Sequence, residues 1–165
     1  MKPNRFMLAL AALCFAAGGA SAQQTDGKSV APKTYKAYMV SDAHLDTQWN
    51  WDLTHTIREY IPRILFQNLW MLERYPDYKF NFEGGIIYRW MKEYYPLHYA
   101  RLQKYIDEGR WHISGASWNA NDPNMPSAES FIRNILLGQE FYKKEFGVRS
   151  TDIFLPDCFG FGYTL

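Results

Sequence analysis

The sequence predicts an α/β fold built around parallel strands, and two features support this prediction. Short apolar segments alternate with longer segments in which apolar residues recur every three or four positions, which is the pattern of strands that alternate with helices. Polar or aromatic residues follow each predicted strand, as expected where a ligand binds beyond the carboxyl ends of parallel strands. With 165 residues, the chain is one domain at most or part of a larger one.

Four segments have the composition of strands. Residues 36–40 form an apolar run that predicts a buried strand, and residues 78–82 alternate between aromatic and polar side chains. The other two predicted strands cover residues 110–114 and 151–155. Because four strands cannot close a barrel of the usual size, we expect the sequence to be a fragment of a longer protein.

Helices are predicted between the strands, over residues 61–75, 86–94, 97–108 and 128–146. The first of them has five apolar residues on one face, namely Ile61, Ile64, Leu65, Leu69 and Leu72. Pro62 suits its first turn, where a missing N–H does no harm, and Pro76 ends it. Ser127 is expected to cap the last helix, with Glu129 favourably placed in its first turn.

Composition excludes one class of partner. The chain has 18 Lys and Arg against 17 Asp and Glu, a net charge of +1, so it lacks the basic excess of a nucleic-acid surface. We therefore expect no nucleic-acid partner. Aromatic residues make up 18% of the chain, which fits either an aromatic core or a protein that handles carbohydrate.

The N-terminus has the features of an export signal. Lys2 and Arg5 precede a short apolar segment, and Ala20-Ser21-Ala22 matches an A-x-A cleavage site. We predict a signal peptide over residues 1–22 and a polar linker over residues 23–34. The signal is bacterial in style, so we expect export to the periplasm or secretion.

Two further expectations follow from this signal. Its apolar segment is too short to span a bilayer comfortably, so no transmembrane span is expected after cleavage. Cys14 lies in the segment to be removed and only Cys158 remains, so the mature chain has no internal disulfide.

The strongest candidate site follows the first predicted strand, at His44 and Asp46. In extended backbone, residues i and i+2 point to the same side, so the imidazole and the carboxylate can converge. This pair suits a divalent metal with mixed N and O ligands, zinc above all. Trp49 and Trp51 follow, and a sugar ring packs against flat aromatic faces. A His-x-Asp pair also arises by chance, and either residue can instead cap the next helix.

The other predicted strand ends also carry polar or aromatic residues. Glu83 follows the second strand, Trp118 and Asp122 follow the third, and Asp157 follows the fourth. Asp157 comes after Pro156, and Pro-Asp is a common turn dipeptide, so it is either a turn residue or a third metal ligand. Two carboxylates and one imidazole would be one ligand short of a tetrahedral zinc site. Asp122 has no assigned chemical role.

At this point the sequence resembles the N-terminal catalytic domain of glycoside hydrolase family 38, the class II α-mannosidases. The matching blocks lie in order along nearly all of the chain after the predicted linker. They are residues 44–51 (HLDTQWNW), 75–80 (YPDYKF), 109–111 (GRW), 122–130 (DPNMPSAES), Arg133, 138–139 (GQ), 145–147 (EFG) and 155–160 (LPDCFG).

The resemblance implies a fold, a metal and site residues. It implies a seven-stranded, parallel-stranded (β/α) barrel-like domain, of which residues 35–165 would be an incomplete N-terminal part. It implies one Zn²⁺, with His44, Asp46 and Asp157 as ligands and a fourth ligand, a His, further along the protein. Asp157 is also expected to be the catalytic nucleophile, Trp49 to stack under the mannose ring, and Phe159 to form a second aromatic wall.

The implied activity is that of a retaining α-mannosidase acting on mannose-containing glycans. Its acid/base carboxylate is expected outside this sequence, so the fragment alone should be inactive and the full-length protein an enzyme. Glu83 stands where the family often has Ser or Gln, and the Gly-Gly-Trp that is usual at the third strand end is replaced by 115–118 (GASW). Two alternatives stay open: another metal-dependent carbohydrate hydrolase, such as a polysaccharide deacetylase, and a non-catalytic sugar-binding relative.

Overall fold

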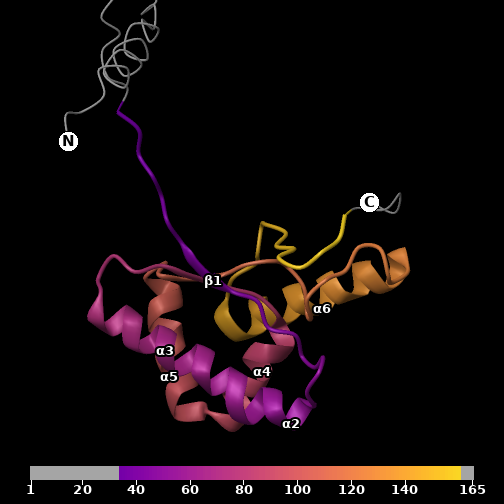
Figure 1. Ribbon diagram of the computed structural model, residues 1–165, viewed down its shortest axis with the longest axis horizontal. Coiled ribbons are helices and arrows are strands. Elements are labelled where there is room, and N and C mark those ends of the chain that lie inside the picture. Colours follow the sequence, from indigo (N-terminus) through magenta and orange to yellow (C-terminus); the bar gives the residue numbers. More distant parts are fainter. Residues whose placement is uncertain (1–33, 161–165) are drawn as a thin grey trace, which may run out of the picture. The chain divides into compact units, whose positions relative to one another are not determined.

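Three short parallel strands form the only sheet in the described part of the chain, which covers residues 34–160 of a computed structural model (Figure 1). The strands are β1 (Ser41–Ala43), β2 (Phe80–Phe82) and β3 (Trp111–Ile113). They lie in the order β1-β2-β3, with Ser41 opposite Phe80 and Phe80 opposite Trp111. Contacts divide the chain into two units, residues 1–37 and 38–165, and all of these strands belong to the second.

The helices lie close to their predicted positions. They are α2 (Leu53–His55), the π-helix η1 (Thr56–Tyr60), α3 (Ile61–Arg74), α4 (Gly85–Tyr94), α5 (Pro96–Asp107) and α6 (Ala128–Phe146). As predicted, Ser127 caps α6, because its side chain accepts a hydrogen bond from Ser130 N. Gly147 ends α6 in the left-handed conformation, with φ of 72°. The short helix α2 and the π-helical turn before α3 were not predicted, since neither has a separate apolar pattern.

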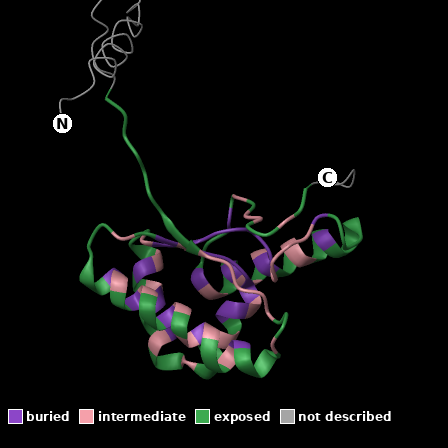
Figure 2. Cartoon of the chain, in the orientation of Figure 1, coloured by how far each residue is buried: buried purple, intermediate pink, exposed green. Residues whose placement is uncertain are grey.

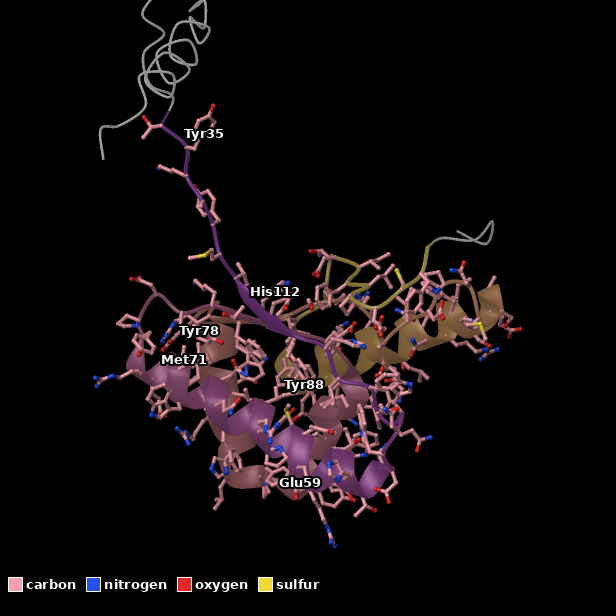
Figure 3. The ribbon with its side chains drawn as sticks, viewed as in Figure 1. Tyr35, Glu59, Met71, Tyr78, Tyr88 and His112 are labelled. Carbon is pink, nitrogen blue, oxygen red and sulfur yellow. The ribbon has the colours of Figure 1, made fainter. Side chains whose placement is uncertain are left out.

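One face of the sheet makes the core. Phe80 and Phe82 of β2 point to the same face as Trp111 and Ile113 of β3, and all four are buried. Helices α3, α4 and α5 lie below the strands in Figure 1, and Figure 2 shows that their buried sides face the sheet. Tyr88 of α4 lies in this core and is labelled in Figure 3; its hydroxyl donates to Phe82 O and accepts from Trp111 Nε1. The Tyr88 hydroxyl and the Trp111 indole N–H are therefore both paired within the core.

The first strand was predicted too early in the sequence. Residues 36–40 were expected to be buried and extended, but the strand is Ser41–Ala43, and the side chains of Tyr38 and Met39 are exposed. Pairing with β2 begins at Ser41, whose N–H donates to Lys79 O. Upstream of that point, no described residue pairs with the backbone, so an apolar run alone did not locate the strand.

The predicted fourth strand is not formed in the described residues. Residues 151–155 have no strand assignment, and Ile153 is exposed. The carboxylate of Asp152, rather than backbone carbonyls, accepts the N–H of Gly115, just beyond β3. The Asp152 side chain thus accepts a backbone N–H that would otherwise be available to pair with a neighbouring strand. The parallel α/β prediction is confirmed as a three-stranded sheet, while the seven-stranded barrel stays a prediction.

Two predictions concern parts of the chain near the N-terminus. The predicted signal peptide, residues 1–22, and residues 23–33 of the predicted linker lie outside the described residues. Among the helices of residues 34–160, none combines the length and the apolar character that crossing a bilayer requires.

Candidate metal centre

His44 and Asp46 converge just beyond the carboxyl end of β1. Neither residue is in the strand, but His44 Nε2 lies 3.3 Å from Asp46 Oδ1. The convergence predicted from the two-residue spacing is therefore present. His44 is partly buried and Asp46 is more exposed, so the pair faces solvent from the edge of the sheet.

Asp157 joins this pair from a distant part of the sequence. Its Oδ2 lies 3.8 Å from His44 Nε2. One potential ligand atom from each of His44, Asp46 and Asp157 lies within 4.8 Å of the others. These are the three residues that the sequence predicted as metal ligands, and the fold brings them together.

Glu83 holds the other side of the imidazole. It follows β2 directly, only 4% of it is exposed, and its Oε1 lies 3.3 Å from His44 Nδ1. Sequence analysis placed Glu83 at a strand end but gave it no role. The sequence signal that could have indicated a role for Glu83 was its position at a strand end of the same predicted sheet as the candidate ligand His44.

Two pKa values in this cluster are raised, each for a different main reason. The hydrogen bond to Glu83 raises the pKa of His44, burial opposes the rise, and the negative charges of Asp46 and Glu83 add to it. Burial raises the pKa of Glu83, and the hydrogen bond and charge of His44 partly offset that rise. Three carboxylates lie close to one imidazole, and this arrangement suits a bound cation.

The donor set fits a zinc-type metal. His44 Nε2 is buried and has no hydrogen-bond partner within residues 34–160, although two carboxylates lie close to it. An unpaired imidazole nitrogen close to two carboxylate oxygens is a donor arrangement that can bind such a metal. With Nδ1–H donating to Glu83, the tautomer leaves that lone pair on Nε2.

Side chains, rather than a strand ladder, hold the segment that carries Asp157. Asp152 accepts hydrogen bonds from Gly115 N at 3.1 Å and from Ser150 Oγ at 3.0 Å, and it lies 3.2 Å from His112 Nε2. Burial alone would raise the pKa of Asp152, but these hydrogen bonds and the charge of His112 lower it overall. His112, labelled in Figure 3, lies on the sheet face opposite the aromatic core.

The loop after Asp46 is closed by a buried threonine. Thr56 is fully buried; its Oγ1 donates to Thr47 O and accepts from Trp51 Nε1, both at 2.8 Å. Trp51 is therefore a structural residue of this loop. Trp49, in contrast, is 75% exposed and meets Trp51 edge to face.

The two predicted sugar-stacking residues have exposed rings. Trp49 lies in the loop after β1, and Phe159 lies two residues beyond Asp157 and is 86% exposed. Their roles stay predictions. A cavity of about 230 Å³ lies beside the loop after Asp46, where Thr47 and Gln48 line it together with Trp118. A larger cavity, of about 560 Å³, lies on the outer side of α3 and includes none of the candidate ligands.

The fold and the site together define an α/β protein with a candidate metal centre at the carboxyl edge of a parallel sheet. Residues 34–165 match the family model of the glycosyl hydrolases family 38 N-terminal domain. The chain belongs to this family, as the sequence resemblance predicted.

Individual relatives agree with this assignment. α-Mannosidase G of Dictyostelium discoideum is 37% identical over 130 residues, which are 79% of this chain and 12% of that protein. α-Mannosidase 2C1 of Homo sapiens is 31% identical over 151 residues, which are 92% of this chain and 14% of that protein. The chain thus spans only about an eighth of the length of these curated relatives.

Solved structures show the same fold. The structure of an α-mannosidase from Enterococcus faecalis V583 aligns with a TM-score of 0.57 at 26% identity, over 67% of this chain and 12% of that one. A second Enterococcus faecalis protein, described as a member of glycosyl hydrolase family 38, aligns with a TM-score of 0.62 at 24% identity, over 73% of this chain and 14% of that one. The second likeness supports the fold alone.

Proposed function

We propose that this chain is the N-terminal part, residues 35–165, of the catalytic domain of an exported zinc-dependent retaining α-mannosidase. The observation that carries the proposal is the convergence of His44, Asp46 and Asp157 from two distant segments at one sheet edge. Family membership and relatives named α-mannosidases support this choice of reaction. The proposed substrates are terminal α-mannosyl residues of glycans.

Asp157 is proposed as the nucleophile. In a retaining glycosidase, a carboxylate attacks the anomeric carbon, the leaving oxygen takes a proton from a separate acid, and water then releases the sugar. Half of the Asp157 side chain is exposed, so a sugar can reach it. The acid/base carboxylate and a fourth metal ligand are proposed to lie further along the full-length protein.

His44, Asp46 and Asp157 would hold the zinc ion. When bound, the ion supplies a fixed positive charge that favours the ionised form of a neighbouring carboxylate and attracts sugar hydroxyls. The ligand atoms of His44 and Asp46 lie within 4.8 Å of a carboxylate oxygen of Asp157, so the proposed nucleophile lies next to the other proposed metal ligands. The buried carboxylate of Glu83 lies on the other side of the ring, 3.3 Å from His44 Nδ1.

The aromatic residues and the nearby cavity complete the proposed sugar site. Trp49 offers an exposed indole face on which a pyranose ring can stack, and Phe159 offers a second exposed ring close in sequence to Asp157. The cavity lined by Thr47, Gln48 and Trp118 lies beside the loop that carries Trp49 and supplies polar groups together with an aromatic wall.

A trapping experiment tests the proposal in the full-length protein. A mechanism-based fluoromannoside should form an ester on Asp157, detected by peptide mass spectrometry. Asp157→Asn should lower turnover by at least about 1000-fold and abolish labelling, while substrate binding stays measurable. Asp77→Asn, which changes an exposed carboxylate in the turn before β2, is the matched control and should label normally.

The result separates the proposal from its alternatives. Labelling of a different carboxylate would remove Asp157 from the nucleophile role. Deacetylation of a polysaccharide without any glycosyl ester would instead identify a metal-dependent deacetylase. Sugar binding with neither reaction would identify a non-catalytic relative.

A further inference from the structure

Glu83 is a buried acid for which the proposed reaction has no direct use. Only 4% of the residue is exposed, so it cannot present its carboxylate to a glycan. Carboxylates are rarely fully buried unless they are paired, because desolvation disfavours the charge. Its one described partner is the ring of His44, at 3.3 Å.

The geometry also excludes Glu83 as a fourth ligand of the same ion. Its Oε1 faces Nδ1 of His44, whereas Asp46 and Asp157 face Nε2. The two nitrogens of an imidazole point in different directions, so a group that hydrogen-bonds Nδ1 lies away from an ion held on Nε2. Glu83 is accordingly not part of the three-residue group whose ligand atoms converge.

The backbone fixes Glu83 where it stands. It follows the last residue of β2, and Gly84 then turns with a φ of 92°, a conformation that favours glycine. The next two residues are tied to the loop after β3, because Gly85 N donates to Ser117 O and Ile86 N donates to Trp118 O. A carboxylate held this rigidly can define the orientation of the ring that it touches.

Its second oxygen lies in an equally restricted space. Oε2 is buried and has no hydrogen-bond partner among residues 34–160. Gly115 lies beside it, since a Cβ added there would be in van der Waals contact with Oε2, at 3.4 Å. The carboxylate is therefore enclosed, and its interaction with His44 is the one polar contact that the described structure gives it.

We propose that Glu83 is a positioning residue that holds His44 with its Nε2 lone pair aimed at the metal, and so sets the affinity of the site for zinc. This inference rests on the proposed zinc site and deepens it. A carboxylate that accepts a hydrogen bond from a ligand His fixes the ring's tautomer and orientation and makes the ligand more basic.

Zinc affinity of the full-length protein tests the inference without reference to turnover. A competing chromophoric chelator measures the zinc dissociation constant of the wild type, Glu83→Gln and Glu83→Ala. Glu83→Ala should raise this constant by about 10- to 100-fold. Glu83→Gln keeps an acceptor oxygen of the same shape but loses the charge, so its constant should fall between the other two.

Thermal melting of the zinc-free proteins separates positioning from a structural role. Glu83→Gln removes a buried charge, so its zinc-free form should melt no lower than the wild type. A zinc affinity that falls only in proportion to a lower melting temperature would indicate a structural residue and overturn the proposal. Glu145→Gln is the matched control: it changes a partly buried acid paired with Lys92, and zinc affinity should stay unchanged.

Each remaining outcome decides the question. Glu83→Ala within twofold of the wild-type constant overturns the inference and leaves the mannosidase proposal intact. If Glu83→Ala does not fold, Glu83→Gln within twofold has the same meaning. A wild-type protein that binds no zinc overturns both proposals, and one that binds zinc but forms no glycosyl ester overturns only the mannosidase.

Discussion

Replacement of Gly138 by alanine should loosen the contact between α6 and the loop that follows β3. Gly138 is a buried residue of α6. A Cβ at this position would lie closer than 3.0 Å to backbone atoms of Ala116, Ser117 and Trp118. Backbone atoms cannot rotate away as a side chain can, so the helix or the loop must shift.

The expected loss in the free energy that holds the loop against α6 combines two opposing effects. Overpacking of a filled interior typically costs about 1–3 kcal/mol. Because the added Cβ would meet backbone atoms of three residues, we expect a cost of about 3 kcal/mol for this substitution. Alanine in place of glycine favours the helix itself by about 1 kcal/mol. The net loss is therefore about 2 kcal/mol, which corresponds to roughly 30-fold faster amide exchange through local opening.

Hydrogen exchange measured by mass spectrometry on the full-length protein checks this value. Peptides covering α6 and residues 115–121 should exchange faster in Gly138→Ala. The loop is bound to α6 by Trp118 N, which donates to Asn134 O, and by Tyr142 Oη, which donates to Ser117 O, so its amides report the same opening.

Gly85→Ala is the graded comparison. A Cβ there would lie 2.9 Å from Cε3 of the Trp118 ring, a side chain that can move by a few tenths of an ångström, so the effect should be smaller. Equal exchange in Gly138→Ala and the wild type would refute the reasoning, because it would mean that the helix and the loop are not in close contact.

Two further predictions concern the metal and pH. His44→Ala in the full-length protein should reduce bound zinc from about one ion per molecule to nearly none, as measured by elemental analysis. His55→Ala, which removes a ring from outside the cluster, should leave the zinc content unchanged. Unaltered zinc content in His44→Ala would show that His44 is not a ligand. The lowered pKa of Asp152 means that its stabilising contacts are fully present above about pH 4 and are lost as the pH falls toward the lowered value. In Asp152→Asn, exchange of peptides from residues 150–160 should therefore depend less on pH below about pH 4, and an unchanged dependence would contradict this assignment.

Helix positions could be predicted from the sequence because local signals and tertiary packing agree. In α3, the apolar face, Pro62 in the first turn and Pro76 after the end predicted nearly the observed range of Ile61–Arg74. All of Ile61, Leu65, Leu69 and Leu72 are buried, as their spacing predicted. The residues at and next to the two ends of this helix therefore define where it begins and ends.

Strand positions were harder to predict because pairing, not composition, defines a strand. Val40 belongs to an apolar run but is exposed, whereas the polar residues Ser41 and Asp42 form most of β1 through their pairing with β2. Likewise, residues 151–155 have strand-like side chains, but a carboxylate takes the donor at the end of β3. Whether such a segment forms a strand therefore depends on pairing partners that are distant in sequence.

The juxtaposition of the three candidate ligands was predictable because it combines a local spacing with a fold rule. His44 and Asp46 are two positions apart, and Asp157 follows a segment that leads to the same sheet edge. The partner of His44 was not predictable in the same way. A glutamate at a strand end has many possible roles, and only the structure shows Glu83 buried against Nδ1 of the ring.

The anchoring of Asp157 links metal occupancy to the local order of the chain. Residues 150–160 are held by side-chain contacts such as those of Asp152 and by Gln139 Nε2, which donates to Ser150 O. Segments of this kind open at a lower free energy than a sheet or a packed helix. An ion shared by His44 and Asp157 would cross-link that segment to the end of β1, so part of its binding free energy would appear as protection of the segment against opening. Metal affinity and the order of residues 150–160 would then be two measurements of one coupled equilibrium.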